Sequence, residues 1–203
     1  MNARIRDAED IIFELGAGGD VIQFTEGEYA HNLTVKAGPG IDTFNLENSF
    51  RNKSTGHQLT LYGEADSDTL FVDYIDVDSS GIVISSVLAD ATSVVFDGGD
   101  GEDTLRIAGD PTVTGTYAPD DTANGAGVVE TRGNTFKFLN VEPLIVHGFK
   151  EFDIDATVSR SDTKIDAIPV ADLDLTNLQL HVVSIDGVVS WTQDVKFEGV
   201  EAP

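Results

Sequence analysis

Residues 94–107 read VVFDGGDGEDTLRI, and nearly the same pattern occurs three more times in the first half of the chain. The other copies are IIFELGAGGDVIQF at 11–24, LTVKAGPGIDTFNL at 33–46 and LTLYGEADSDTLFV at 59–72. Each copy contains a short apolar strand, a turn that ends in aspartate, and a second short apolar strand. The aspartates lie 22, 26 and 35 residues apart, a spacing typical of repeat proteins, and they are Asp20, Asp42, Asp68 and Asp103.

The glycines of these turns occur where a chain needs a positive φ or a close approach of two backbones. On either side apolar and polar residues alternate, so one apolar row faces inward at a period of two, as in Leu33, Val35, Phe44 and Leu46. One copy cannot cover its apolar face, but copies stacked on one another form a continuous core. The sequence therefore predicts an all-β fold: a parallel β-helix, or β-solenoid, with irregular loop insertions between its rungs.

We expect a single β-helical domain over residues 1–203, with glycine/aspartate-turn rungs in 1–107 and longer, more degenerate rungs in 108–203. A second repeat supports this division, because GVVETRGNTFKFLNVEP at 127–143 is echoed by GVVSWTQDVKFEGVEAP at 187–203. Residues 144–154, which follow the first copy, resemble a degenerate strand–turn unit. We interpret the chain as a segment of a longer repetitive protein, or as a module whose C-terminal end continues onto a partner.

Turn residues between the strands predict surface loops at 116–127 and 48–56. Residues 76–81 read DVDSSG, which matches the first half of an EF-hand loop. Val87, however, stands where that loop needs a glutamate, and the flanking residues have the composition of strands. A hairpin turn is the better interpretation.

The net charge of the chain limits the kinds of molecule that it can bind. The 203 residues carry 36 Asp and Glu against 12 Lys and Arg, a formal net charge of −24. This balance argues against binding to nucleic acid or to anionic membranes, both of which select basic patches, and it favours cations. No apolar run is long enough to span a membrane, so we expect no membrane insertion, and the absence of cysteine excludes disulfides and thiolate metal sites.

The turns resemble the haemolysin-type calcium-binding (RTX-like) repeat, G-G-x-G-x-D-x-U-x, most closely at 98–105 and next at 38–44. The later segments, including FLNVEPLIV at 138–146, resemble the β-helical repeat regions of large bacterial surface and secreted proteins. These resemblances imply bound calcium and an extracellular or cell-surface location. Successive motifs in the haemolysin family follow at nine residues, whereas here they are more than twenty apart, so a two-sided calcium roll is not expected.

Stacked carboxylates predict a cation site along one edge of the β-helix. Neighbouring strands lie about 4.8 Å apart, so two such carboxylates repel by about 1 kcal/mol in water and about 3 kcal/mol at an effective dielectric near 20. Calcium, which binds carboxylate and carbonyl oxygens, would convert this repulsion into a stabilising site. The candidate ligands are Asp20, Asp42, Asp66, Asp68, Asp97, Asp100 and Asp103. The alternative is that each aspartate hydrogen-bonds its own turn backbone and faces water.

The function that these features predict is structural: a spacer, filament or matrix subunit, stabilised by calcium, that stacks end to end with itself or with neighbouring repeat modules. We expect no enzyme activity and no catalytic residues, since the four histidines are scattered and no nucleophile elbow, Walker loop or zinc motif occurs. Two alternatives stay open. One is an adhesin or glycan-binding rod that uses the long loops, and the other is a polysaccharide lyase or epimerase, because β-helices also carry such enzymes.

Overall fold

The computed structural model describes residues 10–24, 27–29, 31–46, 50–52, 57–77, 83–85, 93–110, 112–120, 123, 125–154, 163–168, 180–182 and 193–198. All regular structure in these residues is β-strand, and they contain no helix. The all-β prediction is therefore confirmed for the described part of the chain. Within that part, no helix is long and apolar enough to cross a membrane.

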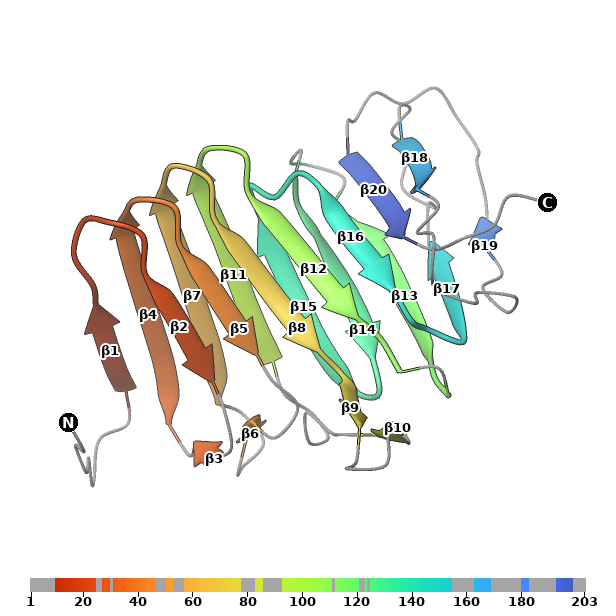
Figure 1. The fold of residues 1–203 in the computed structure, drawn as a ribbon, viewed down its shortest axis with the longest axis horizontal. Helices are drawn as coiled ribbons and strands as arrows, with labels where there is room; N and C mark the ends of the chain where they lie inside the picture. Colours follow the sequence, from red (N-terminus) through yellow and green to blue (C-terminus); the bar gives the residue numbers. More distant parts are fainter. Residues whose placement is uncertain are drawn as a thin grey trace.

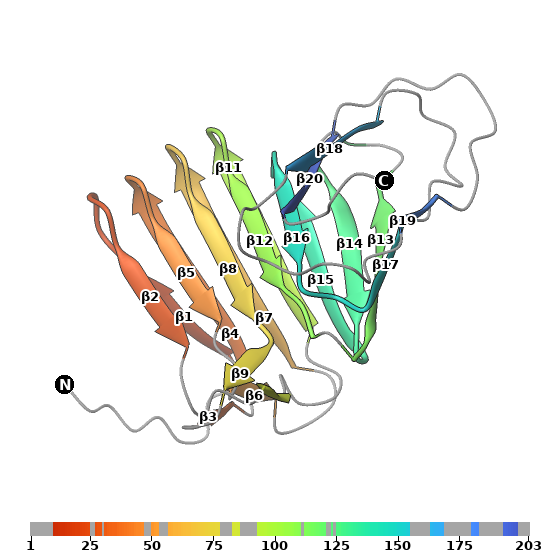
Figure 2. The same ribbon diagram turned by 45° about the vertical axis from the view of Figure 1, so that its right-hand side comes forward.

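Two sheets form the two layers of the fold (Figures 1 and 2). The nine-stranded sheet has the order β1 (Asp10–Glu14), β4 (Asn32–Pro39), β7 (Gln58–Ala65), β11 (Ser93–Asp100), β15 (Asn134–Leu139), β14 (Gly127–Thr131), β13 (Thr114–Pro119), β17 (Glu151–Ile154) and β19 (Leu180–Val182). The seven-stranded sheet has the order β18 (Thr163–Ile168), β20 (Gln193–Glu198), β16 (Leu144–His147), β12 (Thr104–Ala108), β8 (Thr69–Asp73), β5 (Thr43–Leu46) and β2 (Val21–Phe24). Both sheets are mostly parallel.

Four strand pairs repeat one geometry, and we call them unit 1 (10–24), unit 2 (32–46), unit 3 (58–72) and unit 4 (93–107). In each unit the first strand lies in the nine-stranded sheet and the second in the seven-stranded sheet. Residues at the same position of adjacent units are register partners: Phe13, Val35, Leu61 and Phe96 in one sheet, and Ile22, Phe44, Leu70 and Leu105 in the other. No residue is inserted within a unit, so the unequal spacing of the aspartates arises in the connections between units.

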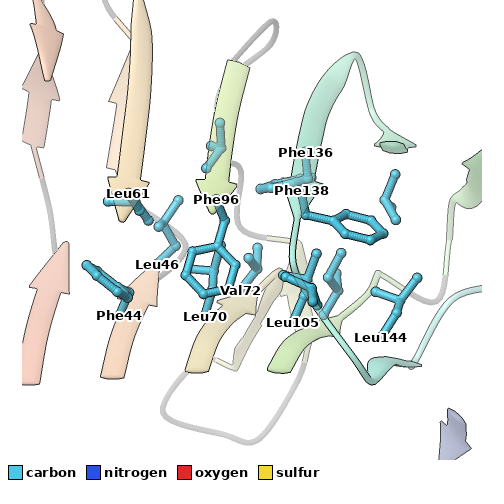
Figure 3. Close-up of a cluster of buried hydrophobic side chains, with 14 of the residues drawn as sticks. Phe44, Leu46, Leu61, Leu70, Val72, Phe96, Leu105, Phe136, Phe138 and Leu144 are labelled. Carbon is cyan, nitrogen blue, oxygen red and sulfur yellow. The ribbon is translucent and has the colours of Figure 1, made fainter. Parts of the chain in front are cut away.

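The core lies between the two sheets, where the alternating apolar rows meet (Figure 3). Phe44 and Phe96 contact edge to face with ring centroids 5.9 Å apart, although they belong to different sheets. Burial of a large apolar side chain of this kind stabilises the folded state by about 1.5–3 kcal/mol. Most of the fully buried side chains come from units 2 to 4 and from the strands after them, including Leu46, Leu59, Leu61, Leu70, Phe136, Phe138 and Phe152, and Tyr74 lies in the connection after unit 3.

The connections between units contain short strands of their own. β3 (Gly27–Tyr29) and β6 (Phe50–Asn52) pair in parallel, so the loop predicted at 48–56 includes a strand. β9 (Ile75–Val77) and β10 (Val83–Ser85) pair antiparallel, with Val77 opposite Val83. This pairing confirms the hairpin predicted around residues 76–81 and is not the helical flank of an EF-hand.

The loop predicted at 116–127 is wrong for its first four residues. They belong to β13, which runs antiparallel to β14, and β14 in turn runs antiparallel to β15. Tyr117 is fully buried and stacks on Phe138 with ring centroids 5.9 Å apart. Tyr117 thus occupies an inward-facing strand position, although turn-forming residues follow it in the sequence.

Within the described residues, the echo between 127–143 and 187–203 matches 134–139 with 193–198, and these two segments lie in different sheets. β15 lies in the nine-stranded sheet, whereas β20, which contains the matching residue Phe197, pairs with β16 in the seven-stranded sheet. Residues 144–154 do form two strands joined by a short turn, as expected. These strands, β16 and β17, lead from the seven-stranded sheet to the nine-stranded one, which is opposite to the direction in units 1–4.

Unit 3 carries two side chains in a backbone conformation that favours glycine. Glu64 and Asp66 have φ values of 79° and 78°, and the matching residues of unit 4 are Gly99 and Gly101, with φ values of 98° and 151°. A residue with a side chain in the left-handed region destabilises the folded state by about 1–2 kcal/mol. Replacement by glycine removes this cost, but glycine loses more backbone entropy on folding, so the net stabilisation is smaller. We expect Glu64→Gly to stabilise the protein by up to about 1 kcal/mol in urea unfolding.

Glu130→Gly provides the matched control for this substitution, because Glu130 is an exposed residue of β14 with an ordinary strand backbone. There we expect glycine to destabilise the protein by about 0.5–1 kcal/mol. Equal losses from both substitutions would show that Glu64 does not adopt the left-handed conformation.

Candidate functional site: a buried aspartate row

The aspartates that end the four turns form a row along the edge where the chain crosses between the sheets. Asp42, Asp68 and Asp103 are buried, with exposed fractions of 0%, 1% and 1%. Asp20, in the outermost unit, is half-buried. The row results from the identical length of the four turns, because every aspartate follows the first residue of its unit by the same distance along the chain. We refer to these four residues as the aspartate row.

Each carboxylate of the row beyond Asp20 binds the neighbouring unit. The backbone N–H of Asp20 donates to Asp42 Oδ1 at 2.7 Å, that of Asp42 to Asp68 Oδ1 at 2.7 Å, and that of Asp68 to Asp103 Oδ1 at 2.8 Å. The backbone carbonyls of the row accept in the same regular way, for example from Thr69 N to Asp42 O at 3.0 Å. Hydrogen bonds to a carboxylate are among the stronger ones in proteins. The row therefore links the units along the stacking direction.

This geometry corrects the interpretation in which each aspartate hydrogen-bonds its own turn and faces water. The buried aspartates do hydrogen-bond backbone N–H groups, but those groups belong to the adjacent unit and not to their own turn. Their carboxylates also point away from water, because the side chains of Asp42, Asp68 and Asp103 are buried. Sequence alone could not show this, since the donor is 22 to 35 residues away.

A small residue five positions before each buried aspartate makes room for the carboxylate. These residues are Ala37, Gly63 and Gly98, and all three are buried. A Cβ added at Gly63 would collide with Asp68 Oδ2, and one added at Gly98 would lie 2.5 Å from Asp103 Cγ. Sequence reasoning included Gly98 among the turn glycines that allow a close backbone approach, but it did not single out Ala37 or Gly63. The signal was present as a small residue at a constant distance before the aspartate.

The buried carboxylates are only partly satisfied. The Oδ2 atoms of Asp42, Asp68 and Asp103 are buried and accept no hydrogen bond from the described residues. Burial raises the pKa of all three carboxyls, the backbone hydrogen bond opposes this, and neighbouring aspartates raise the pKa further. For Asp68 the result is a pKa of about 6, against 3.8 for an ordinary aspartate. Asp68 therefore takes up a proton at a higher pH than an ordinary aspartate does.

The other predicted ligands lie around the row without joining it. Asp66 and Asp100 are exposed in their turns, and Asp97 Oδ1 accepts from Asn140 Nδ2 at 2.7 Å. Their charges still affect the row, because Asp66 raises the pKa of Asp68 while Asp97 and Asp100 raise that of Asp103.

Calcium needs six to eight oxygen ligands, and the described side chains do not assemble such a set. No group of three or more His, Asp or Glu residues in the described ranges lies close enough together to hold a metal ion. In the row itself, one oxygen of each buried carboxylate is already used by a backbone N–H. These side chains do not by themselves fit a calcium ladder, and bound calcium stays a prediction of the sequence.

The structure also contains a buried ion pair that sequence reasoning missed. Asp110, with an exposed fraction of 1%, accepts from Thr112 N at 2.7 Å and from Thr112 Oγ1 at 2.6 Å. Its second oxygen lies 3.1 Å from Arg132 Nη1. This pair fastens the connection after β12 to the turn between β14 and β15. The local signal was the Asp-Pro-Thr sequence, which is typical of an Asx turn, but its distant arginine could not be identified without the fold.

Comparison of the chain with protein-family models, with curated proteins and with solved structures finds no match.

Proposed function

We propose that the chain is a parallel β-helix that serves as a structural module of an extracellular or cell-surface protein: a spacer, or a subunit of a filament or matrix. The observation that carries the proposal is the constant register of units 1 to 4, in which two sheets advance together, one strand each per unit. Such an array grows in one dimension, because the strands of each unit pair with those of the neighbouring units.

Two properties of the array suit a load-bearing role. Main-chain hydrogen bonds connect every unit to the next in both sheets, and the aspartate row adds one charge-assisted bond between each pair of units. The net charge of −24 keeps an elongated protein soluble and limits lateral association. End-to-end stacking with further repeat modules is then the natural way for such a chain to associate.

No specific contact of the described residues favours the two alternatives over this proposal. A glycan-binding rod would have used the predicted loop at 116–127, but Tyr117 of this segment is part of the core. A polysaccharide lyase or epimerase would need acidic or basic groups gathered in a groove on the outside of the stack. Glycan arrays and polysaccharide degradation assays are the direct tests of these alternatives.

Single-molecule force spectroscopy tests the mechanical part of the proposal. The chain is placed between marker domains of known unfolding force and pulled by its two ends. We expect resistance in successive steps, each corresponding to the 22 to 35 residues that separate neighbouring units. Extension without resistance, at forces that leave the marker domains folded, would contradict a load-bearing role.

The location is tested separately, with antibodies against the folded chain applied to intact cells and to lysed cells. We expect labelling of intact cells or of the surrounding matrix. Labelling that requires lysis would contradict the extracellular assignment and leave the mechanical result unaffected.

A further inference from the structure

Unit 1 lies at one end of both sheets. β1 is the first strand of the nine-stranded sheet and β2 the last of the seven-stranded sheet, so among the described residues the outer edges of both strands have no strand partner (Figure 1). The corresponding strand edges of units 2, 3 and 4 pair with the strands of the unit that precedes each of them. The end of the stack therefore presents two open parallel edges side by side.

Several apolar residues of unit 1 are exposed at this end, although Phe24 is buried in the core. Phe13 is 47% exposed, whereas its register partners in units 2 to 4 are 3% exposed or less. Leu15 is 38% exposed, although its counterpart Ala37 is fully buried. Even an outward position is apolar, because Val21, which is 69% exposed, stands where units 2 to 4 have threonine. Unit 1 therefore has apolar residues at positions that, in an internal unit, a neighbouring unit would cover.

The aspartate row gives the open end a polarity. In each of the three unit interfaces, the N–H of one aspartate donates to the carboxylate of the aspartate in the next unit. Asp20 donates to Asp42, and the same rule assigns the Asp20 carboxylate to the N–H of an aspartate in a unit that precedes it. The open end thus has the acceptor, the apolar row and both strand edges of an internal interface.

We propose that this end binds a further glycine–aspartate strand–turn–strand unit, supplied by a neighbouring module. Its two strands pair in parallel with β1 and β2, and its aspartate N–H donates to the Asp20 carboxylate. The argument for this occupant is continuity, because the interface would repeat the contacts already made three times within the chain. The proposal rests on the proposed structural function and identifies the end at which stacking occurs and the partner it accepts.

A labelled peptide with the sequence of residues 93–107 is the probe, titrated into the full chain and followed by fluorescence anisotropy. We expect saturable binding that a peptide of scrambled sequence does not show. Asp20→Ala is expected to weaken binding about tenfold, through loss of a hydrogen bond to a charged group. N-methylation of the peptide at the position of Asp103 removes the donor and should weaken binding to the same extent.

Combining Asp20→Ala with the N-methylated peptide distinguishes loss of this hydrogen bond from a general disturbance of the interface. If the N–H and the carboxylate are partners, the N-methylated peptide binds Asp20→Ala no more weakly than the unmodified peptide does. Phe13→Asp should abolish binding, because it puts a charge into the apolar row. Ile41→Asp is the matched control: Ile41 is 70% exposed, but it lies in the turn of unit 2, so binding should not change.

Normal binding to both Asp20→Ala and Phe13→Asp would overturn the proposal. A second result would also overturn it: the peptide does not bind, and sedimentation shows a dimer that Phe13→Asp dissociates. The end would then be covered by a second copy of the chain. Force measurements on the isolated chain do not involve the peptide. A stack that resists force but does not bind the peptide would contradict this inference alone.

Discussion

Gly98→Ala is expected to lower the free energy of unfolding by about 2–4 kcal/mol, as for overpacking at a rigid core position. The added Cβ would lie 2.5 Å from the backbone oxygen of Asn140 and 2.5 Å from both Cβ and Cγ of Asp103. None of these atoms is the free end of a flexible side chain, since the Asp103 carboxylate is held by Asp68 N at 2.8 Å. Relief therefore requires a shift of the neighbouring strand or loss of that hydrogen bond.

Urea unfolding of Gly98→Ala beside Gly16→Ala measures this effect. Gly16 lies in the turn of unit 1, where an added Cβ meets no atom within 4 Å and φ is outside the left-handed region. We expect Gly16→Ala to change the free energy of unfolding by less than about 0.5 kcal/mol. A Gly98→Ala protein as stable as the wild type would show that the Asp103 carboxylate does not occupy the space beside Gly98.

Acidification from pH 8 to pH 5 is expected to stabilise the protein, which is opposite to the behaviour of a carboxylate held in a salt bridge. The pKa of Asp68 is about 6 in the folded chain and 3.8 in the unfolded chain, so the folded state binds more protons between these values. The stability from this group is fully present below 3.8 and is lost as the pH rises through 6. Asp68 alone contributes about 1 kcal/mol by pH 5, and the raised pKa values of Asp42 and Asp103 act in the same direction.

Asp68→Asn isolates this contribution. The amide oxygen of asparagine still accepts from Asp42 N, and the neutral side chain removes a buried charge that lies between two others. At pH 8 we expect the variant to be more stable than the wild type by about 1–2 kcal/mol and to depend less on pH. Asp153→Asn, the same change of charge on β17 and outside the row, should leave the pH dependence unaltered.

The same melting curves, recorded in calcium, in magnesium and after chelation, test the calcium prediction. If protons alone neutralise the aspartate row, the melting temperature depends on pH as described above and does not change when calcium is added. A calcium-specific rise in melting temperature at pH 8 that Asp68→Asn removes would assign the ion to the row and confirm the sequence-based prediction.

For the pH prediction, an Asp68→Asn protein less stable than the wild type at pH 8 would contradict the account of an unfavourable buried charge.

The repeated unit could be predicted from the sequence because its signals are local. The alternation of Leu33 and Val35 and of Phe44 and Leu46 specifies which face of each strand is buried. The recurrence of the pattern with a turn of constant length then implies that the strands of successive units pair in register. The loop predicted at 116–127 was wrong for its first four residues for the complementary reason. Local composition does not determine whether Tyr117 finds a partner such as Phe138, or which sheet receives β20.

Local pattern was thus enough to predict that the described part of this protein is all-β, where four of its strand–turn–strand units lie, and that their aspartates share one position. The role of those aspartates became visible only in three dimensions. Asp42, Asp68 and Asp103 each accept from a unit 22 to 35 residues away and are buried over Ala37, Gly63 and Gly98. Hydrogen-bond partner, burial and pKa all depend on which atoms surround a group in space, and here the stacking of units, and not the turn, supplies those atoms.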